Sequence, residues 1–287
     1  MLAAALEATS FAILITDTEP RILGVNSAFT QVTGFAAADV VGQNPSILSS
    51  GQQDPAFYRS LWQQLSREGH WAGEIWNRHR EGHTFAEWLS IDAIRDDDGK
   101  VTNFVGVFND ISSRKAREEQ LEWHALHDPL TALPNRTLLA DRLNLSLQRA
   151  RREGHMVALL ALDLDGFKAV NDDYGHAAGD QMLQEVAIRL SDSVRSCDTV
   201  ARLGGDEFIV LCPAIEGPRI GTMVANRMMA SLRTPIRCGN AELMIEASIG
   251  IAFFPLHGSS AANLMQRADE AMYAAKQAGK ARIELAA

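Results

Sequence analysis

Two adjacent glycines followed by two adjacent acids, Gly204-Gly205-Asp206-Glu207, are the residues whose types and spacing best suit chemistry. They lie between apolar runs at 199–203 and 208–212, so we expect them at the tip of a β-hairpin. Glycines let a ligand approach the main chain closely. Two neighbouring carboxylates repel each other, which costs free energy unless a cation neutralises their charge. The stretch suggests a nucleoside triphosphate carried on Mg²⁺, with an ordinary Gly-Gly turn and solvated acids as the alternative.

A third carboxylate, Asp163, closes an almost unbroken apolar run at 156–164. Such a run is typical of a central strand buried on both faces. If this strand lies beside the hairpin, Asp163 faces Asp206 and Glu207 across the sheet. Three convergent carboxylates make a site for one or two Mg²⁺ ions, which clamp the attacking and leaving oxygens of a phosphoryl displacement.

The elements around these acids predict an α+β chain of two units. In the second unit helices alternate with strands, but the central pair forms a hairpin, which favours a ferredoxin-like βαββαβ core. In the first unit two strands, small helices and a three-strand meander predict an antiparallel sheet with flanking helices. We expect one strand at 243–254 and a loop at 42–55. The charged stretch 114–127 predicts a helix, either a solvated linker or a short two-chain coiled coil.

Composition excludes several classes of protein. The chain has 287 residues and a formal net charge of -9, which argues against non-specific nucleic-acid binding. No run approaches the ~18 apolar residues of a membrane span, and the N-terminus lacks the basic flank of a signal peptide. The three cysteines show no metal-ligand spacing, so we expect reduced thiols and a cytoplasmic location.

The second unit resembles a GGDEF domain. The resemblance rests on Asp163-Leu164-Asp165-Gly166-Phe167-Lys168, Asn171-Asp172, Gly179-Asp180, Gly204 to Phe208, Ser248-Ile249-Gly250 and Ala271-Met272-Tyr273, and it covers about residues 128–285. Such domains are diguanylate cyclases, which condense two GTP into cyclic di-GMP and release two pyrophosphates. The resemblance implies a homodimer in which each domain supplies half of the active site.

The resemblance also assigns roles to individual residues. Asp206 and Glu207 match catalytic positions; Asp163, the Leu164 carbonyl, Asp206 and Glu207 match ligands of two Mg²⁺ ions, with Mn²⁺ as an alternative metal. Eight residues match GTP-binding positions of the family. Asn171 and Asp180 match the pair that binds the guanine edge. The main chain of Phe167, Gly204 and Gly205 matches segments that approach the nucleotide, and Lys168, Lys276 and Lys280 match the basic groups that hold the triphosphate. An amide and a carboxylate suit the guanine edge because they accept from its N–H groups.

Two departures and one further signature accompany this match. Ala132 stands where the family usually has glycine, and Lys280-Ala281 stands where it often has Arg-Asn, so one forked phosphate contact becomes a point charge. Arg195 and Asp198 form an Arg-x-x-Asp at the family's spacing before Gly204 and match the inhibitory site for cyclic di-GMP. Their other interpretation is a solvated charge pair.

The first unit resembles a PAS sensor domain over about residues 1–112, through Asn26 to Phe29, Gly34-Phe35 and the segment from Trp71 to Arg78. Trp71, Trp76 and Asn77 are compatible with a flavin pocket, but tryptophans there are also ordinary core or interface residues. Haem ligation by His70 or His79 is a further alternative, and the PAS ligand stays open.

Together these observations predict a PAS domain at 1–112, a helical linker at 113–128 and a GGDEF domain at 129–287. The expected function is a Mg²⁺-dependent homodimeric diguanylate cyclase, regulated by the PAS unit through the linker helix and by product at Arg195 and Asp198. A catalytically silent cyclic di-GMP receptor and a PAS-mediated scaffold are the alternatives.

Overall fold

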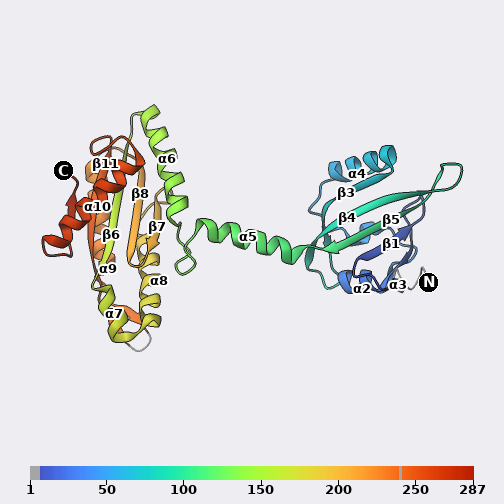
Figure 1. Cartoon of the computed structure of the whole chain (residues 1–287), viewed down its shortest axis with the longest axis horizontal. Helices are drawn as coiled ribbons and strands as arrows, with labels where there is room; N and C mark the ends of the chain where they lie inside the picture. The colour runs from blue at the N-terminus through green and yellow to red at the C-terminus, as the bar shows by residue number, and fades with distance from the viewer. Residues whose placement is uncertain (1–6, 239–240) are drawn as a thin grey trace. The chain divides into compact units, whose positions relative to one another are not determined.

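The chain folds into two compact units in the computed structural model, which describes residues 7–238 and 241–287. Contacts divide the chain into residues 1–120 and 121–287 (Figure 1). This division falls inside the segment 113–128 predicted as a linker. Residues 1–6 of the predicted sensor domain lie outside the described residues.

The N-terminal unit is an antiparallel sheet with helices packed on one face. Its strands occur in the order β2-β1-β5-β4-β3. The strands are β1 (Ala12–Thr16), β2 (Ile22–Val25), β3 (His70–Arg78), β4 (Thr84–Arg95) and β5 (Val101–Asp110). The helices are α2 (Ser27–Thr33), α3 (Ala37–Val40), the 3₁₀ helix η1 (Pro45–Leu48) and α4 (Pro55–Glu68). The three-strand meander predicted from the sequence is present as β3, β4 and β5.

The segment predicted as a loop at 42–55 contains the short helix η1. The Asn44 side chain accepts a hydrogen bond from the Ser46 amide at 2.9 Å, and Pro45 occupies the first turn. Proline suits this position because its fixed φ is helical and its missing N–H would have no partner there. These two residues convert part of the expected loop into a helical turn.

The helix α5 (Ser112–Leu126) begins directly after the last strand of the N-terminal unit. Asp110 accepts a hydrogen bond from the Ser112 amide at 2.7 Å, and the Ser112 hydroxyl accepts one from the Ala86 amide at 2.9 Å. One turn later the Lys115 ammonium pairs with Glu74 on β3 at 2.5 Å. The start of the helix is therefore fixed to strands β3, β4 and β5.

The C-terminal unit has a five-stranded sheet in the order β12-β11-β6-β8-β7. Its strands are β6 (Met156–Asp165), β7 (Thr199–Gly204), β8 (Glu207–Ile215), β11 (Glu246–Phe254) and β12 (Ile283–Leu285), and β9 (Ile236–Cys238) pairs separately with β10 (Ala241–Leu243). Its helices are α6 (Arg136–Glu153), α7 (Phe167–Tyr174), α8 (His176–Asp192), α9 (Pro218–Leu232) and α10 (Ala261–Gln277). Apart from β12, this strand order is that of a ferredoxin-like core and confirms the α+β prediction.

Helices cover both faces of this sheet. One apolar cluster joins even-numbered residues of β6, such as Leu160 and Leu162, to α8 and α9. A second cluster joins odd-numbered residues, such as Leu159, to α6 and α10. The eight residues from Val157 to Leu164 are all buried, which confirms the prediction of a central strand.

One strand of the C-terminal unit differs from the sequence-based prediction. The expected strand at 243–254 is interrupted, because Leu243 pairs with Ile236 in the separate β9–β10 ribbon while β11 begins at Glu246. After β6 the chain forms two successive helices, because Gly175 has φ of 81° and turns the chain between α7 and α8. Among the described helices, none is long and apolar enough to cross a membrane.

Candidate functional site

The sheet brings the three acids predicted as metal ligands together at one end of the neighbouring strands β6 and β8. Asp163, at the end of β6, is paired with Glu207, the first residue of β8. The Leu164 amide donates a hydrogen bond to the Asp206 carbonyl at 3.4 Å. Asp163 is 8% exposed, whereas Glu207 is exposed and Asp206 half-buried. Asp163 is thus the buried member of the set, and the two acids of the hairpin are more accessible to solvent.

The two glycines of the hairpin tip leave its main chain open. Gly204 has φ of 146° and Gly205 of 53°, conformations that side-chain-bearing residues rarely adopt. A Cβ built on either glycine meets no atom within 4 Å. The reason for glycine is therefore backbone conformation and access for a ligand, not crowding within the protein.

The Arg202 side chain holds this tip in place through hydrogen bonds. Its Nε and Nη2 donate to the Gly205 carbonyl at 3.0 and 2.7 Å, and its Nη1 donates to Asp128 at 2.8 Å. Burial by itself raises the pKa of Asp128, but hydrogen bonds from Thr131 and Arg202 outweigh that effect and hold the pKa below its usual range. The sequence alone gives no sign of this pair, because its partners are 74 residues apart.

The negative charges gathered at this end of the strands favour a bound cation. Burial raises the pKa of Asp163, and the negative charges of Asp206 and Asp165 raise it further, against the opposing effect of Lys276. The Lys276 ammonium lies 2.6 Å from Asp163 Oδ2. Carboxylate and carbonyl oxygens are the ligands that Mg²⁺ prefers, so Asp163, the Leu164 carbonyl, Asp206 and Glu207 fit this metal chemically.

Lys276 reaches Asp163 because α10 lies very close to β11. A Cβ on Gly250 would come within 2.1 Å of the Met272 nitrogen and 2.2 Å of the Ala268 oxygen. Only a glycine at position 250 permits this approach, which places the last turn of α10 beside the carboxylates.

The residues predicted to bind guanine lie around the corner between α7 and α8. Asn171 is half-buried on α7, and Asp180 is exposed in the first turns of α8. A Cβ on Gly179 would lie 2.0 Å from the Asn171 Oδ1 atom. Gly179 therefore leaves the space that the Asn171 amide occupies.

The residues predicted to contact phosphates come from two further segments. Phe167 and Lys168 form the first turn of α7, directly after the strand that ends at Asp165; helix N-termini favour anions. Lys280 is exposed and has φ of 62°, and the neighbouring Ala281 amide donates to Asp165 at 3.0 Å. The Ser248 hydroxyl also donates to Asp165, so Asp165 anchors the segment that carries Lys280.

The predicted inhibitory residues form a tight turn. The Arg195 amide donates to Asp198 Oδ2 at 2.9 Å, and the Asp198 amide donates to the Arg195 carbonyl at 3.0 Å. Beside this turn lies a cleft of about 620 Å³, lined by Asp198 and by Arg142 and Arg149 of α6. Arg195 is exposed, so its guanidinium is accessible to an anion.

In the N-terminal unit, only one of the three residues predicted to line a ligand pocket does so. Asn77 is on the wall of a cavity of about 160 Å³, whereas Trp71 and Trp76 are not on its walls. Trp71 is buried against Phe57, with ring centroids 5.9 Å apart. Trp71 is therefore accounted for as a core residue.

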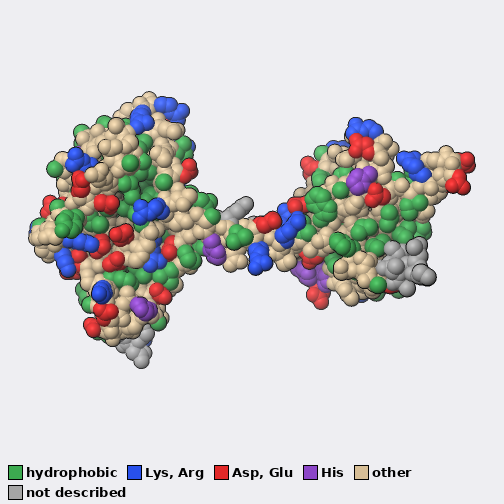
Figure 2. All heavy atoms as spheres, in the orientation of Figure 1, with side chains coloured by type: hydrophobic (Ala, Val, Ile, Leu, Met, Phe, Trp, Pro, Cys, Tyr) green, Lys and Arg blue, Asp and Glu red, His purple; other side chains and the backbone are tan. Residues whose placement is uncertain are grey.

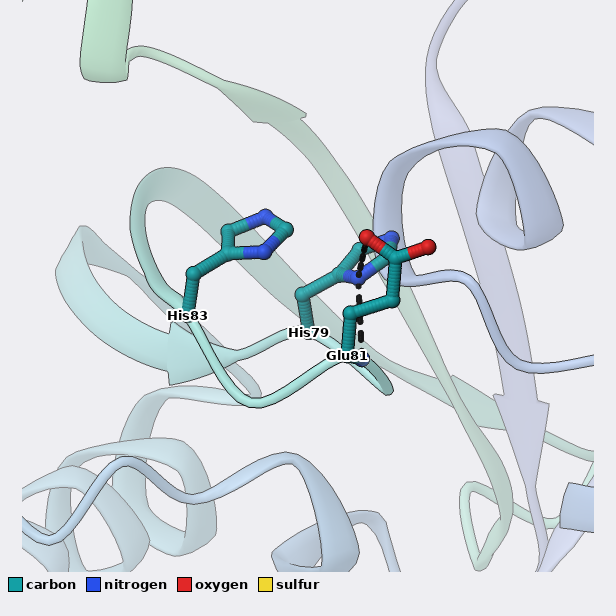
Figure 3. Close-up of side chains that lie close together, drawn as sticks. All are labelled: His79, Glu81 and His83. Carbon is teal, nitrogen blue, oxygen red and sulfur yellow. Dashed lines mark hydrogen bonds and ion pairs between the residues drawn. The ribbon is translucent and has the colours of Figure 1, made fainter.

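The two histidines considered as haem ligands also lie away from this cavity. His70 pairs with Asp92 at 2.8 Å on the surface. His79 stacks on His83 with ring centroids 4.3 Å apart, and its Nδ1 accepts the Glu81 amide at 3.2 Å (Figure 3). These three side chains could offer metal-ligand atoms within 4.8 Å of one another. The His79 Nδ1 is already engaged by the hairpin, which counts against a metal there.

Acidic and basic side chains are interspersed on the face of the C-terminal unit drawn in Figure 2. A nucleic-acid-binding domain typically shows a basic face instead.

Comparison with known proteins identifies the family. The family described as "Diguanylate cyclase, GGDEF domain" matches residues 125–282, and the PAS domain family matches residues 10–113. The chain therefore belongs to the GGDEF diguanylate cyclase family and carries an N-terminal PAS domain.

Individual relatives support the same assignment. The chain is 50% identical over 156 residues to MucR of Pseudomonas aeruginosa, named a bifunctional diguanylate cyclase/cyclic di-GMP phosphodiesterase, covering 54% of this chain and 23% of MucR. It is 35% identical over 263 residues to an uncharacterized signaling protein of Caulobacter vibrioides, covering 91% of this chain and 32% of that protein. A solved structure of an N-terminally truncated TpbB from Pseudomonas aeruginosa, comprising only the GGDEF domain, shares 40% identity and a TM-score of 0.55, covering 56% of this chain and 94% of that chain. The chain spans less than half the length of these two curated relatives.

Proposed function

We propose that this protein is a diguanylate cyclase that joins two GTP molecules into cyclic di-GMP. The observation that carries the proposal is the pairing of Asp163 with Glu207 beside the open main chain of Gly204 and Gly205. In each of two equivalent steps, the 3′-hydroxyl of one GTP attacks the α-phosphorus of the other. A new P–O bond forms, the bond to pyrophosphate breaks, and the hydroxyl proton leaves for a base.

The residues of this chain would bind and orient GTP. Asn171 and Asp180 hold the guanine edge, and the first turn of α7, with Phe167 and Lys168, receives phosphate oxygens at its amides. Lys276 and Lys280 supply positive charge to the triphosphate. Asp206 or Glu207 accepts the proton of the attacking hydroxyl.

The metal requirement is part of the proposal. Asp163, the Leu164 carbonyl, Asp206 and Glu207 would hold two Mg²⁺ ions, or Mn²⁺. Such ions stabilise the negative charge that develops on the phosphoryl oxygens. Without a divalent metal, the Lys276 ammonium next to Asp163 provides the only cation paired with that acid among the described residues.

Catalysis by this site would require two copies of the chain. The site on one GGDEF domain binds one GTP, so a second domain must present the second GTP across a two-fold axis. The PAS unit and α5 would bring two copies together and control their geometry. The proposal places the enzyme in the cytoplasm, where GTP is available.

Product inhibition would act at the turn formed by Arg195 and Asp198. The exposed Arg195 guanidinium can donate two parallel hydrogen bonds to a phosphate or a guanine edge. Arg142 and Arg149 on the wall of the adjacent cleft supply further positive charge. Substituting Arg195 with alanine should relieve inhibition by cyclic di-GMP without changing the initial rate. Unchanged inhibition in that variant would contradict this part of the proposal.

A flavin bound to the PAS unit stays the cofactor alternative, although Asn77 is the only one of the three residues behind it that lines the cavity. An absorption spectrum of the purified protein tests it directly. A flavin spectrum would support this alternative, and a colourless protein would remove both flavin and haem.

The cyclase proposal is tested by incubating the full chain with GTP and Mg²⁺ and separating the products. We expect cyclic di-GMP and pyrophosphate in a ratio of one to two, and no product from the double variant Asp206→Ala/Glu207→Ala. The matched control is Asp97→Ala/Asp98→Ala, which removes two adjacent exposed acids from the β4–β5 turn and should leave activity intact.

Two other results would overturn the proposal in different ways. Binding of cyclic di-GMP without turnover of GTP would indicate a receptor, and this binding should then depend on Arg195. Neither binding nor turnover would indicate a scaffold.

A further inference from the structure

The N-terminal unit contains a cavity of about 160 Å³ that is partly open to solvent and has no role in the site described above. Its walls are mostly apolar and come from the sheet, through Leu14, Ile75 and Leu89, and from α4, through Leu61. A dry cavity of about 150 Å³ is large enough to bind benzene. This cavity therefore has room for one ring with a small substituent.

One wall of the cavity carries a carboxyl group with an unused oxygen. Glu87 on β4 is 1% exposed. Its Oε1 accepts a hydrogen bond from the Asn77 amide at 2.9 Å, whereas its Oε2 is buried and has no hydrogen-bond partner in the part of the chain that the structure describes. Buried polar atoms are normally paired, so Oε2 is available to form a hydrogen bond with a molecule in the cavity.

The surroundings of Glu87 determine which partner fits. Burial raises the pKa of Glu87 to about 8, and the negative charge of Asp110 on β5 adds to this effect, while the Asn77 hydrogen bond opposes it. The side chain is therefore mostly a neutral acid at pH 7 and presents an O–H donor. Tyr58 is the other titratable residue on the cavity wall, and no Lys, Arg or His lines it.

We propose that this cavity binds a small, uncharged, ring-sized compound that accepts a hydrogen bond from the Glu87 carboxylic acid. A carbonyl oxygen or a neutral ring nitrogen has the required chemistry. An anion finds no positive charge on the walls.

The site lies next to the start of α5. Glu87 pairs with Asp110 in the β4–β5 register, and Asp110 accepts the Ser112 amide that begins α5. The neighbouring Ala86 donates its amide to the Ser112 hydroxyl and accepts the Ile111 amide at 2.8 Å. A compound that engages Glu87 therefore contacts the strand that fixes this helix. The binding proposal itself does not depend on cyclase activity.

Pyridine and benzene test the proposal, because they have nearly the same shape and only pyridine accepts a hydrogen bond. Binding of each to the full chain near neutral pH is measured by NMR titration of the amides of β4. We expect pyridine to bind about tenfold more tightly than benzene, which corresponds to about 1.4 kcal/mol. Equal binding of the two, or binding of neither, would overturn the proposal.

Two substitutions separate hydrogen bonding from a general change in the cavity. Glu87→Gln keeps a donor at the same place and should retain the preference for pyridine, whereas Glu87→Leu should bind both compounds equally. Glu81→Gln, an exposed acid in the same hairpin, is the matched control and should behave as the unsubstituted protein. Preferential binding of benzylammonium that is lost in Glu87→Gln would show instead that the site takes a cation.

Discussion

Replacing Arg202 with methionine should destabilise the GGDEF unit selectively. Methionine keeps much of the apolar stem but removes two hydrogen bonds to the Gly205 carbonyl and one to Asp128. The two charged side chains are only 10% and 17% exposed. Breaking a fully buried pair costs about 3–5 kcal/mol.

The expected cost here is smaller, because Asp128 keeps two hydrogen bonds from Thr131, at 2.9 and 2.6 Å. We therefore expect a loss of about 2–3 kcal/mol in the free energy of unfolding. With a urea slope of about 2 kcal/mol/M, the midpoint falls by about 1 M or slightly more. The matched control is Arg267→Met, which breaks a pair whose side chains are 50% and 49% exposed, and should cost at most about 1 kcal/mol.

The distribution of tryptophans lets one experiment follow the two units separately. Four of the five tryptophans lie before residue 121, and only Trp123 lies beyond it. Tryptophan fluorescence therefore reports mainly on the PAS unit, while far-UV circular dichroism reports on both. The Arg202→Met variant should shift the transition seen by circular dichroism and leave the fluorescence transition nearly in place.

The pH dependence gives a second check. Because the pKa of Asp128 is lowered by folding, its contribution to stability is present above the unfolded value near 4 and is lost as the pH falls through the folded value. The stability difference between the original chain and Arg202→Met should therefore shrink below about pH 4. A shift no larger than that of Arg267→Met, or an equal shift of both transitions, would refute the reasoning.

Three further outcomes are expected. Ala132 has φ of 60°, so Ala132→Gly should stabilise the chain by about 0.5–1 kcal/mol in urea unfolding, and a loss of stability would contradict a strained alanine. Gly179→Ala would place a Cβ 2.0 Å from Asn171 Oδ1; we expect GTP to bind about tenfold more weakly by calorimetry, with unchanged affinity counting against the role of Asn171. Burial raises the pKa of the Cys212 thiol to about 12, whereas Cys197 is exposed, so iodoacetamide at pH 8 should label Cys197 in the native protein, and mass spectrometry should find Cys212 unmodified.

Sequence patterns predicted the elements whose signals are local. The apolar run of β6 and the glycines of the hairpin identified two neighbouring strands, and the ferredoxin-like topology then placed Asp163 opposite Glu207. Family resemblance supplied the roles of Asn171 and Lys276, because helix spacing alone does not tell which exposed polar residue binds a ligand.

The contacts that connect distant segments could not be predicted. The Lys276–Asp163 pair depends on how closely α10 lies on β11, and Gly250 reveals that approach only once the two elements are packed. Glu87 did carry a readable signal. Alternation along β4 places it on the same face as the buried Phe85 and Leu89, whereas Trp88 points outward and is 45% exposed. An acid on the apolar face of a strand is the pattern that indicates a buried functional carboxyl.

The shortness of α5 has a consequence for how output would scale in the cell. Its 15 residues span about 22 Å, or two heptads, and its apolar residues Leu121 and Leu126 are exposed by 63% and 38%. So short a helix offers little apolar surface for self-association, so the proposed paired state would be a minority species at low abundance. The concentration of pairs then grows with the square of the copy number. Expression level would therefore be an input to second-messenger production alongside any compound in the PAS cavity.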